Sequence, residues 1–155
     1  MNVQYTGARN DVLEFYKRLP FNTMRSPETM AEIIKQKNLV IDIYPNIEDF
    51  YEADTLLEMG CGTGWLSNSI AYYYGTNITA IDFNSVAVDS AKKCMEILGT
   101  DLDFQCADLF QYQCEPKDIV ISNGVLHHTS DVKGGGNTLC RFNKARRKDF
   151  YRTIS

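Results

Sequence analysis

Three glycines alternate with other residues in the segment Glu58–Gly64, which reads Glu-Met-Gly-Cys-Gly-Thr-Gly. Glycine has no Cβ, so this segment can turn tightly and let a ligand contact its backbone. The apolar residues before it predict a buried strand, and residues Trp65–Tyr74 predict a helix. The first N–H groups of such a helix have no partner within the helix. We therefore expect a small polar ligand at the end of a parallel strand.

A carboxylate ends the second predicted strand, Ile78–Asp82. Asp82 lies about twenty residues beyond the glycine loop, which is the offset of the acid that binds ribose in nucleotide sites. A carboxylate at a strand end can accept hydrogen bonds from both ribose hydroxyls. Asp82 could instead cap the following helix, but Asn84 or Ser85 can also cap it and leave Asp82 for the ligand. The loop and the acid together predict a nucleoside site.

The glycine spacing differs from the G-x-G-x-x-G pattern of nicotinamide dinucleotide sites. The third glycine of that pattern would fall at Trp65 when counted from Gly60, or at Ser67 when counted from Gly62. A tryptophan would block the close approach of helix and strand that the third glycine permits. An NAD-dependent oxidoreductase is therefore the less favoured alternative.

Three ordered motifs resemble those of class I S-adenosylmethionine-dependent methyltransferases. They are residues 57–64, 80–84 and 120–128, and the resemblance runs from residue 54 to residue 131, half of the chain. It implies an α/β fold, the Rossmann-like three-layer sandwich with a parallel central sheet. It also implies S-adenosyl-L-methionine as the cofactor and methyl transfer to a small-molecule acceptor, which the sequence does not identify.

The resemblance further implies roles for individual residues. Glu58 would organise the loop and bind the methionine amino group, and Asp82 would bind the ribose. The other cofactor-binding residues that it implies are Gly60, Cys61, Gly62 and Gly64 beneath the methionine part, Phe83 beside the adenine, the segment Cys106, Ala107, Asp108 and Leu109, whose acid takes the adenine amino group, and Asn123 and Gly124 near the methionine part.

The only two histidines, His127 and His128, follow the fourth predicted strand on the same rim. Their ordinary pKa lies near neutral, so either could accept a proton from a hydroxyl, a thiol or a carbon acid. Neighbouring residues on one element face apart, and we favour His128 as the residue that faces the substrate. A structural role for both is the alternative. No third ligand has suitable spacing, so we expect no metal.

Strands and helices alternate along the middle of the chain. We expect strands at 55–59, 78–82, 101–105 and 118–122 and helices at 64–74 and 85–98. This alternation predicts a parallel sheet with right-handed crossovers. Ser26 and Pro27 predict the start of a further helix before the sheet. The expected divisions are an N-terminal helical cap (1–50), the S-adenosylmethionine-binding α/β core (51–142) and a basic C-terminal tail (143–155).

The family's sheet usually has seven strands, and the sequence after Phe142 does not supply the later ones. Residues 143–149 are basic and polar, and residues 150–155 are too short and polar to complete a sheet. We expect an incomplete sheet of strands 1–4, from truncation or a frame shift. Its fourth strand would become an edge that invites self-association. The main alternative to an active enzyme is thus a cofactor-binding but inactive methyltransferase fragment.

The composition indicates a cytoplasmic protein. The 155 residues include 20 acidic and 16 basic ones, a net charge of −4, whereas a nucleic-acid partner would call for a basic domain. The polar N-terminus has no signal-peptide core, and no apolar run approaches the ~20 residues that span a membrane. The five cysteines form no C-x-x-C pair, which favours free thiols in a reducing compartment.

Overall fold

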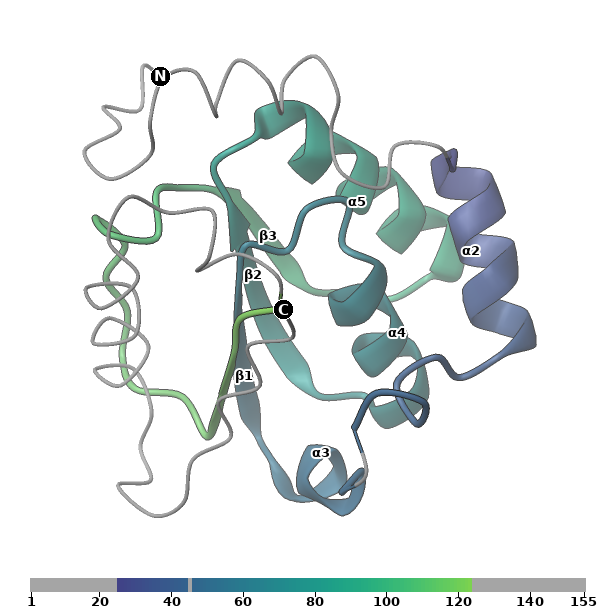
Figure 1. Cartoon of the computed structure of the whole chain (residues 1–155), viewed down its shortest axis with the longest axis horizontal. Helices are drawn as coiled ribbons and strands as arrows, with labels where there is room; N and C mark the ends of the chain where they lie inside the picture. The colour runs from purple at the N-terminus through teal and green to yellow at the C-terminus, as the bar shows by residue number, and fades with distance from the viewer. Residues whose placement is uncertain (1–24, 45, 124–155) are drawn as a thin grey trace.

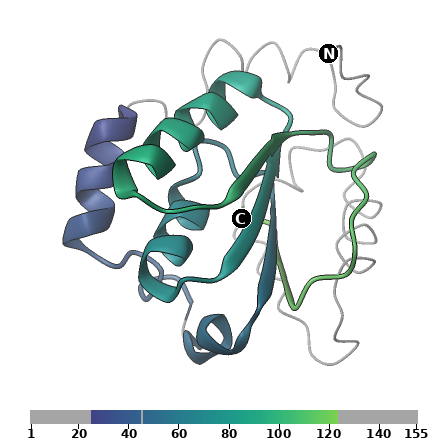
Figure 2. The same ribbon diagram turned by 180° about the vertical axis from the view of Figure 1, so that it is seen from behind.

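The computed structural model of the protein describes residues 25–44 and 46–123. Its helices are α2 (Pro27–Gln36), α3 (Glu48–Glu52), α4 (Trp65–Tyr74) and α5 (Ser85–Leu98). Helices α4 and α5 lie against one side of a sheet, and α2 packs outside them (Figure 1). The segment that joins the last two strands runs along the other side, as the view from behind also shows (Figure 2). Among the described residues, only one face of the sheet is therefore covered by helices.

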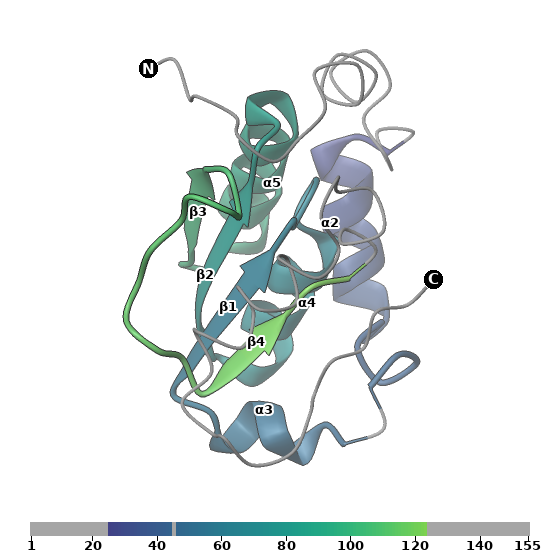
Figure 3. The ribbon, with the colours of Figure 1, turned by 60° about the vertical axis from the view of Figure 1, so that its left-hand side comes forward.

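The sheet is parallel and four-stranded, with the strand order β3-β2-β1-β4 (Figure 3). Its strands are β1 (Thr55–Met59), β2 (Asn77–Asp82), β3 (Asp103–Cys106) and β4 (Ile119–Ile121). All strands run the same way, so their carboxyl ends meet at one rim. The predicted parallel α/β core is confirmed. Within the described residues, β3 and β4 lie at the two edges of the sheet.

Local signals in the sequence set most element boundaries. Ser26 caps α2, and its hydroxyl accepts a hydrogen bond from the backbone of Thr29 at 3.3 Å. Helices α4 and α5 end at Gly75 and Gly99, which adopt the left-handed conformation that glycine favours. β3 begins two residues later than predicted, because its pairing with β2 starts at Asp103.

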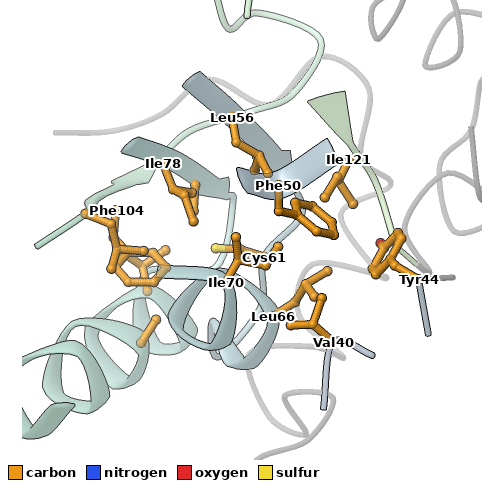
Figure 4. Close-up of a cluster of buried hydrophobic side chains, with 14 residues drawn as sticks. Val40, Tyr44, Phe50, Leu56, Cys61, Leu66, Ile70, Ile78, Phe104 and Ile121 are labelled. Atoms are coloured by element: carbon orange, nitrogen blue, oxygen red, sulfur yellow. The ribbon is translucent and has the colours of Figure 1, made fainter. Parts of the chain in front are cut away.

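The hydrophobic core between the sheet and α4 fixes the helix beneath the rim. Leu56 and Ile78 point from the strands toward Leu66 and Ile70 of the helix (Figure 4). Each of these side chains is fully buried. Burying one such side chain contributes about 1.5–3 kcal/mol, so the start of α4 is held rigidly against the strand ends.

A second core cluster lies on the opposite face of the sheet. It contains Leu57, Met59, Ile81, Leu109 and Val120. Residues of β1 and β2 thus alternate between two buried faces, which explains why both strands read as continuous apolar runs.

Helix α2 forms the outer layer, where Met30, Ala31 and Ile34 pack against Cys94 and Leu98 of α5. The described part of the predicted cap therefore supports the helical layer. The remainder of the cap, residues 1–24, and the predicted tail lie outside the described residues. None of the described helices combines the length and apolar character needed to span a membrane.

Candidate active site

The glycine loop folds back against the end of β2. Gly60, Gly62 and Gly64 have φ values of +80°, +54° and +73°, a region that favours glycine. The backbone N–H groups of Gly60 and Cys61 both donate to the carbonyl oxygen of Ile81, at 2.7 and 3.0 Å. The ends of β1 and β2 are thereby joined by the loop itself.

Gly64 allows α4 to begin close to its neighbours. A Cβ at this position would lie 2.6 Å from Cβ of Ala91 and 2.8 Å from Cζ of Phe104. In nicotinamide sites the third glycine lets the helix approach the strand closely. Here Gly64, one residue before Trp65, allows that close approach. The partly buried Trp65 packs beside the α2 cluster.

Asp82 ties the glycine loop to the start of the next turn. Its side chain is 8% exposed, and its two oxygens accept hydrogen bonds from the backbone N–H groups of Gly62 and Asn84, both at 2.8 Å. Asn84 caps α5, as we predicted it could. Asp82 is nevertheless not free of protein contacts. The backbone of Phe83 donates a third hydrogen bond to this carboxyl. A carboxylate has about four acceptor positions, so about one is left for a ligand.

Glu58 lies buried at the end of β1, beneath the glycine loop. Ser67, in the first turn of α4, donates a hydrogen bond from its hydroxyl to Oε2 of Glu58, and its backbone N–H also bonds the carboxyl. Burial raises the pKa of Glu58 to about 7, although the bonds from Ser67 oppose this shift. The negative charge of Asp82 also contributes to this raised pKa. Two buried acids therefore occupy adjacent strand ends.

The end of β3 is linked to the end of β2. The backbone N–H of Ala107 donates to the carbonyl oxygen of Asp82 at 2.8 Å. The thiol of Cys106 lies 3.5 Å from the carbonyl oxygen of Phe83, to which it donates. The structure thus brings the second motif (80–84) next to the predicted adenine-binding segment that begins at Cys106.

Asp108 and Leu109 follow directly. Asp108 is buried, and its Oδ1 accepts a hydrogen bond from the backbone of Phe110 at 2.9 Å. Leu109 packs in the core on the far face of the sheet. The partly buried Asn123 lies two residues beyond the end of β4.

The remaining predicted site residues, Gly124, His127 and His128, lie outside the described residues. Within residues 25–44 and 46–123, no group of three or more His, Cys, Asp or Glu side chains could hold a metal ion.

Sequence reasoning missed Thr63, Ser67 and Ser122. Thr63 and Ser122 are buried, and neither hydroxyl has a hydrogen-bond partner among the residues that the structure describes. Thr63 lies inside the glycine loop, and Ser122 follows β4 at the rim. The available signal was the run of polar residues 67–69 within an otherwise apolar helix, because buried polar groups need partners.

The sequence profile of the family described as "Methyltransferase domain" matches residues 56–144. The chain belongs to this family. It is also 33% identical over 122 residues to malonyl-[acyl-carrier protein] O-methyltransferase 2 of Ilyobacter polytropus, covering 76% of this chain and 46% of that protein. The chain thus spans less than half the length of this relative.

Solved structures have the same fold. Magnesium protoporphyrin IX methyltransferase from Synechocystis PCC 6803 matches with a TM-score of 0.56 at 21% identity, over 76% of this chain and 54% of that one. The [4+2]-cyclase SpnF matches with a TM-score of 0.54 at 28% identity, over 58% and 35% of the two chains. The predicted family and fold are confirmed, and the oxidoreductase alternative is set aside. The fold alone does not define the reaction.

Proposed function

We propose that this protein binds S-adenosyl-L-methionine at the rim formed by the ends of β1, β2, β3 and β4, and transfers its methyl group to a small-molecule acceptor. The observation that carries the proposal is the 2.8 Å hydrogen bond from the Gly62 N–H to Asp82. It joins the glycine loop to the predicted ribose-binding acid in one site, within a chain that belongs to the methyltransferase domain family.

The charges of this site suit such a cofactor. S-Adenosylmethionine carries a sulfonium and an ammonium group, both positive. The buried acids Glu58 and Asp82 face this region, and among the described residues Asp82 is the one charged group that shifts the pKa of Glu58. Two acids that no base compensates within residues 25–44 and 46–123 make a local negative potential that attracts a cation.

The loop also has room and polar groups for a ligand. A Cβ added at Gly62 would meet nothing within 4 Å. Thr63 follows Gly62 directly, and its buried hydroxyl has no partner in the described part of the chain. A buried polar group usually has a partner, so a ligand group that bonds Thr63 would satisfy it.

The proposed binding roles follow the order of the motifs. Glu58 holds the methionine ammonium group, and Asp82 holds the ribose hydroxyls. The other contacts are made by Gly60, Cys61, Gly62 and Gly64 to the methionine part, by Phe83 and the segment Cys106, Ala107, Asp108 and Leu109 to the adenine, and by Asn123 and Gly124 to the methionine part.

The cofactor, when bound, supplies a methyl group on a sulfonium, which is a good leaving group. The protein contributes the alignment of the acceptor nucleophile with the methyl group, and the exclusion of water. His128, or else His127, accepts the proton of the acceptor. The reducing cytoplasm is the proposed location, in keeping with the free thiols of Cys61, Cys94, Cys106 and Cys114.

Calorimetric titration with S-adenosylhomocysteine, and separately with NAD, tests the binding site. We expect binding of the first ligand only, and an absence of heat with S-adenosylhomocysteine would overturn the proposal. Transfer of a labelled methyl group from S-adenosylmethionine to a panel of small molecules then tests the reaction. Binding without transfer to any of them would favour the inactive fragment.

Among the strands that the structure describes, β4 lies at one edge of the sheet, which supports a second, separate proposal that two copies of the chain associate through it. Sedimentation velocity over a range of protein concentrations tests this. A monomer at all concentrations would contradict it, without bearing on the cofactor site.

A further inference from the structure

The pair formed by Glu58 and Ser67 carries more than the proposed binding role of Glu58 alone. Ser67 is fully buried in the first turn of α4, and Glu58 lies at the end of β1. Two groups of Ser67, its hydroxyl and its backbone N–H, bond the same carboxyl. Helix α4 has Gly64 at its N-cap, with no hydrogen bond from a capping side chain. Glu58, which lies on β1 and not in the helix, therefore acts as the capping side chain of α4.

We propose that Ser67 is a positioning residue that fixes the Glu58 carboxylate for the ammonium group of the cofactor, and that cofactor binding therefore releases a proton from Glu58. This inference rests on the proposed function. It adds a residue that the family motifs did not supply and a linkage between cofactor affinity and pH.

The surroundings of Glu58 explain why Ser67 can position its carboxylate and why cofactor binding can release its proton. A carboxylate buried in the protein is stable only if hydrogen bonds or a cation compensate its charge. Ser67 supplies two hydrogen bonds to Glu58 but no positive charge. The titratable groups that face Glu58 among the described residues are Asp82 on β2 and the Cys61 thiol in the loop. Neither is a cation, so a ligand ammonium group is the missing compensation.

The linkage has a definite direction. Burial raises the pKa of Glu58 to about 7 in the free protein, so about half of the molecules carry a proton there at neutral pH. An ammonium group pairs only with the ionised form. The affinity should therefore rise roughly tenfold between about pH 6 and about pH 8, and reach a plateau above that.

Asp82 titrates in the same site, since burial raises its pKa as well. The test must separate the two acids. 5′-Methylthioadenosine keeps the ribose and adenine of the cofactor but lacks the amino-acid part. Its binding responds to Asp82 and not to Glu58, so it serves as the matched probe beside S-adenosylhomocysteine.

The experiment is calorimetric titration of the full chain with both probes from about pH 5.5 to about pH 8, for the unaltered protein, Ser67→Ala and Ser69→Ala. Ser69 is the matched control, because it lies in the same helix, is equally buried, and bonds the carbonyl oxygen of Trp65 at 2.6 Å. Repeating the titration near pH 7 in buffers of different ionisation enthalpy counts the protons released. Thermal unfolding confirms that each variant folds.

Loss of the Ser67 hydroxyl raises the pKa of Glu58 further, because a hydrogen bond to the charged form is lost. In Ser67→Ala, we expect the pH midpoint for S-adenosylhomocysteine to move upward. The affinity falls roughly three- to tenfold at pH 7 and recovers in part at higher pH. Ser69→Ala keeps the original midpoint, and 5′-methylthioadenosine binds both variants with the profile of the unaltered protein.

A uniform loss of affinity at every pH in Ser67→Ala, with an unmoved midpoint, would assign Ser67 a purely structural role and overturn the inference. So would equal pH profiles for the two probes in the unaltered protein. In either case S-adenosylhomocysteine still binds, and the proposed function stands. Failure of both probes to bind would instead reject the proposed function.

Discussion

Two consecutive strand-to-helix turns lie side by side at the rim of the sheet, and their helices begin in different ways. Helix α5 begins after Asn84, whose side-chain oxygen accepts hydrogen bonds from the backbone of Val86 and Ala87 at 3.1 and 3.4 Å. Helix α4 begins after Gly64, which has no side chain to accept such a bond. The N–H groups at the start of α5 are thus bonded by a residue of the same turn. Those at the start of α4 depend instead on Glu58 from the preceding strand.

The difference separates a structural turn from a ligand-binding one. A capping side chain occupies the space in front of the first helical turn and removes its free donors. A glycine loop leaves that space open and brings the backbone within reach of a ligand. Asp82 belongs to both turns, because it bonds Gly62 of the first and Asn84 of the second. Substitutions in the two turns should therefore affect stability and cofactor binding differently.

The largest expected effect is on the stability of the first turn. Gly64→Ala should lower the free energy of unfolding by roughly 3–5 kcal/mol, because the new Cβ would overlap Ala91 and Phe104 at a positive φ. Gly75→Ala is the control, since Gly75 has a similar φ of +66° and nothing within 4 Å of the added Cβ. It should cost about 1–2 kcal/mol. Urea denaturation measures both, and equal losses would contradict the packing role of Gly64.

The next effect concerns pH. The pKa of Glu58 rises from 4.5 to about 7 on folding, because the carboxyl is buried. The protonated Glu58 is favoured in the folded state, so its contribution to the free energy of unfolding is complete below about pH 4.5. That contribution is lost as the pH rises through about 7. The loss is roughly 3 kcal/mol in the cofactor-free protein.

Urea denaturation across this range, compared with Glu58→Gln, isolates that contribution. The variant should lose the part of the pH dependence that Glu58 contributes, while Asp82, whose pKa is also raised, leaves a slope of the same sign. The prediction for Glu58 is wrong if both proteins show the same slope.

Substitutions at Asp82 and Asn84 compare the shared acid with the local cap. Asp82→Ala should weaken S-adenosylhomocysteine binding by on the order of 1–3 kcal/mol, through loss of charge-assisted hydrogen bonds to the ribose. Asn84→Ala should destabilise the fold by about 1 kcal/mol and leave binding unchanged, because it removes only a helix cap. Calorimetry and thermal unfolding measure the two effects. Unchanged affinity in Asp82→Ala would contradict its assigned role.

The sequence predicted the elements of both turns well, because their signals are local. Strand β1 has the predicted bounds, and Gly75 and Gly99 end the two helices where expected. Alternation of strands and helices implies a parallel sheet, and a parallel sheet places Glu58 and Asp82 on one rim. The order and direction of the strands were therefore enough to predict that Glu58 and Asp82 lie on the same rim.

The contacts within the rim could not be predicted in this way. The bond between Glu58 and Ser67 depends on the path of the loop between them, which three positive φ angles determine. The hydrogen bond from the Gly62 N–H to Asp82 depends on the same path. A spacing pattern states which residues are present but not where the loop aims its N–H groups. The roles of His127 and His128 stay predictions, since both lie outside the described residues.

The last substitution has a small expected effect and tests the open turn most directly. Gly62→Ala should cost only about 1–2 kcal/mol of stability, as Gly75→Ala does, because both positions have positive φ and open space around the added Cβ. The two variants should nevertheless differ in binding. A methyl group at Gly62 would project into the space that we assign to the cofactor and lower affinity for S-adenosylhomocysteine by about tenfold, or 1.4 kcal/mol.

Gly75 lies at the far end of α4, so its substitution should leave that affinity unchanged. Unfolding and calorimetry on the same two variants thus separate strain in the backbone from loss of ligand space. If the two variants bind equally well, the open space beside Gly62 is not where the cofactor lies. The contrast between a closed turn at α5 and a ligand-binding turn at α4 would then fail, even with the fold intact.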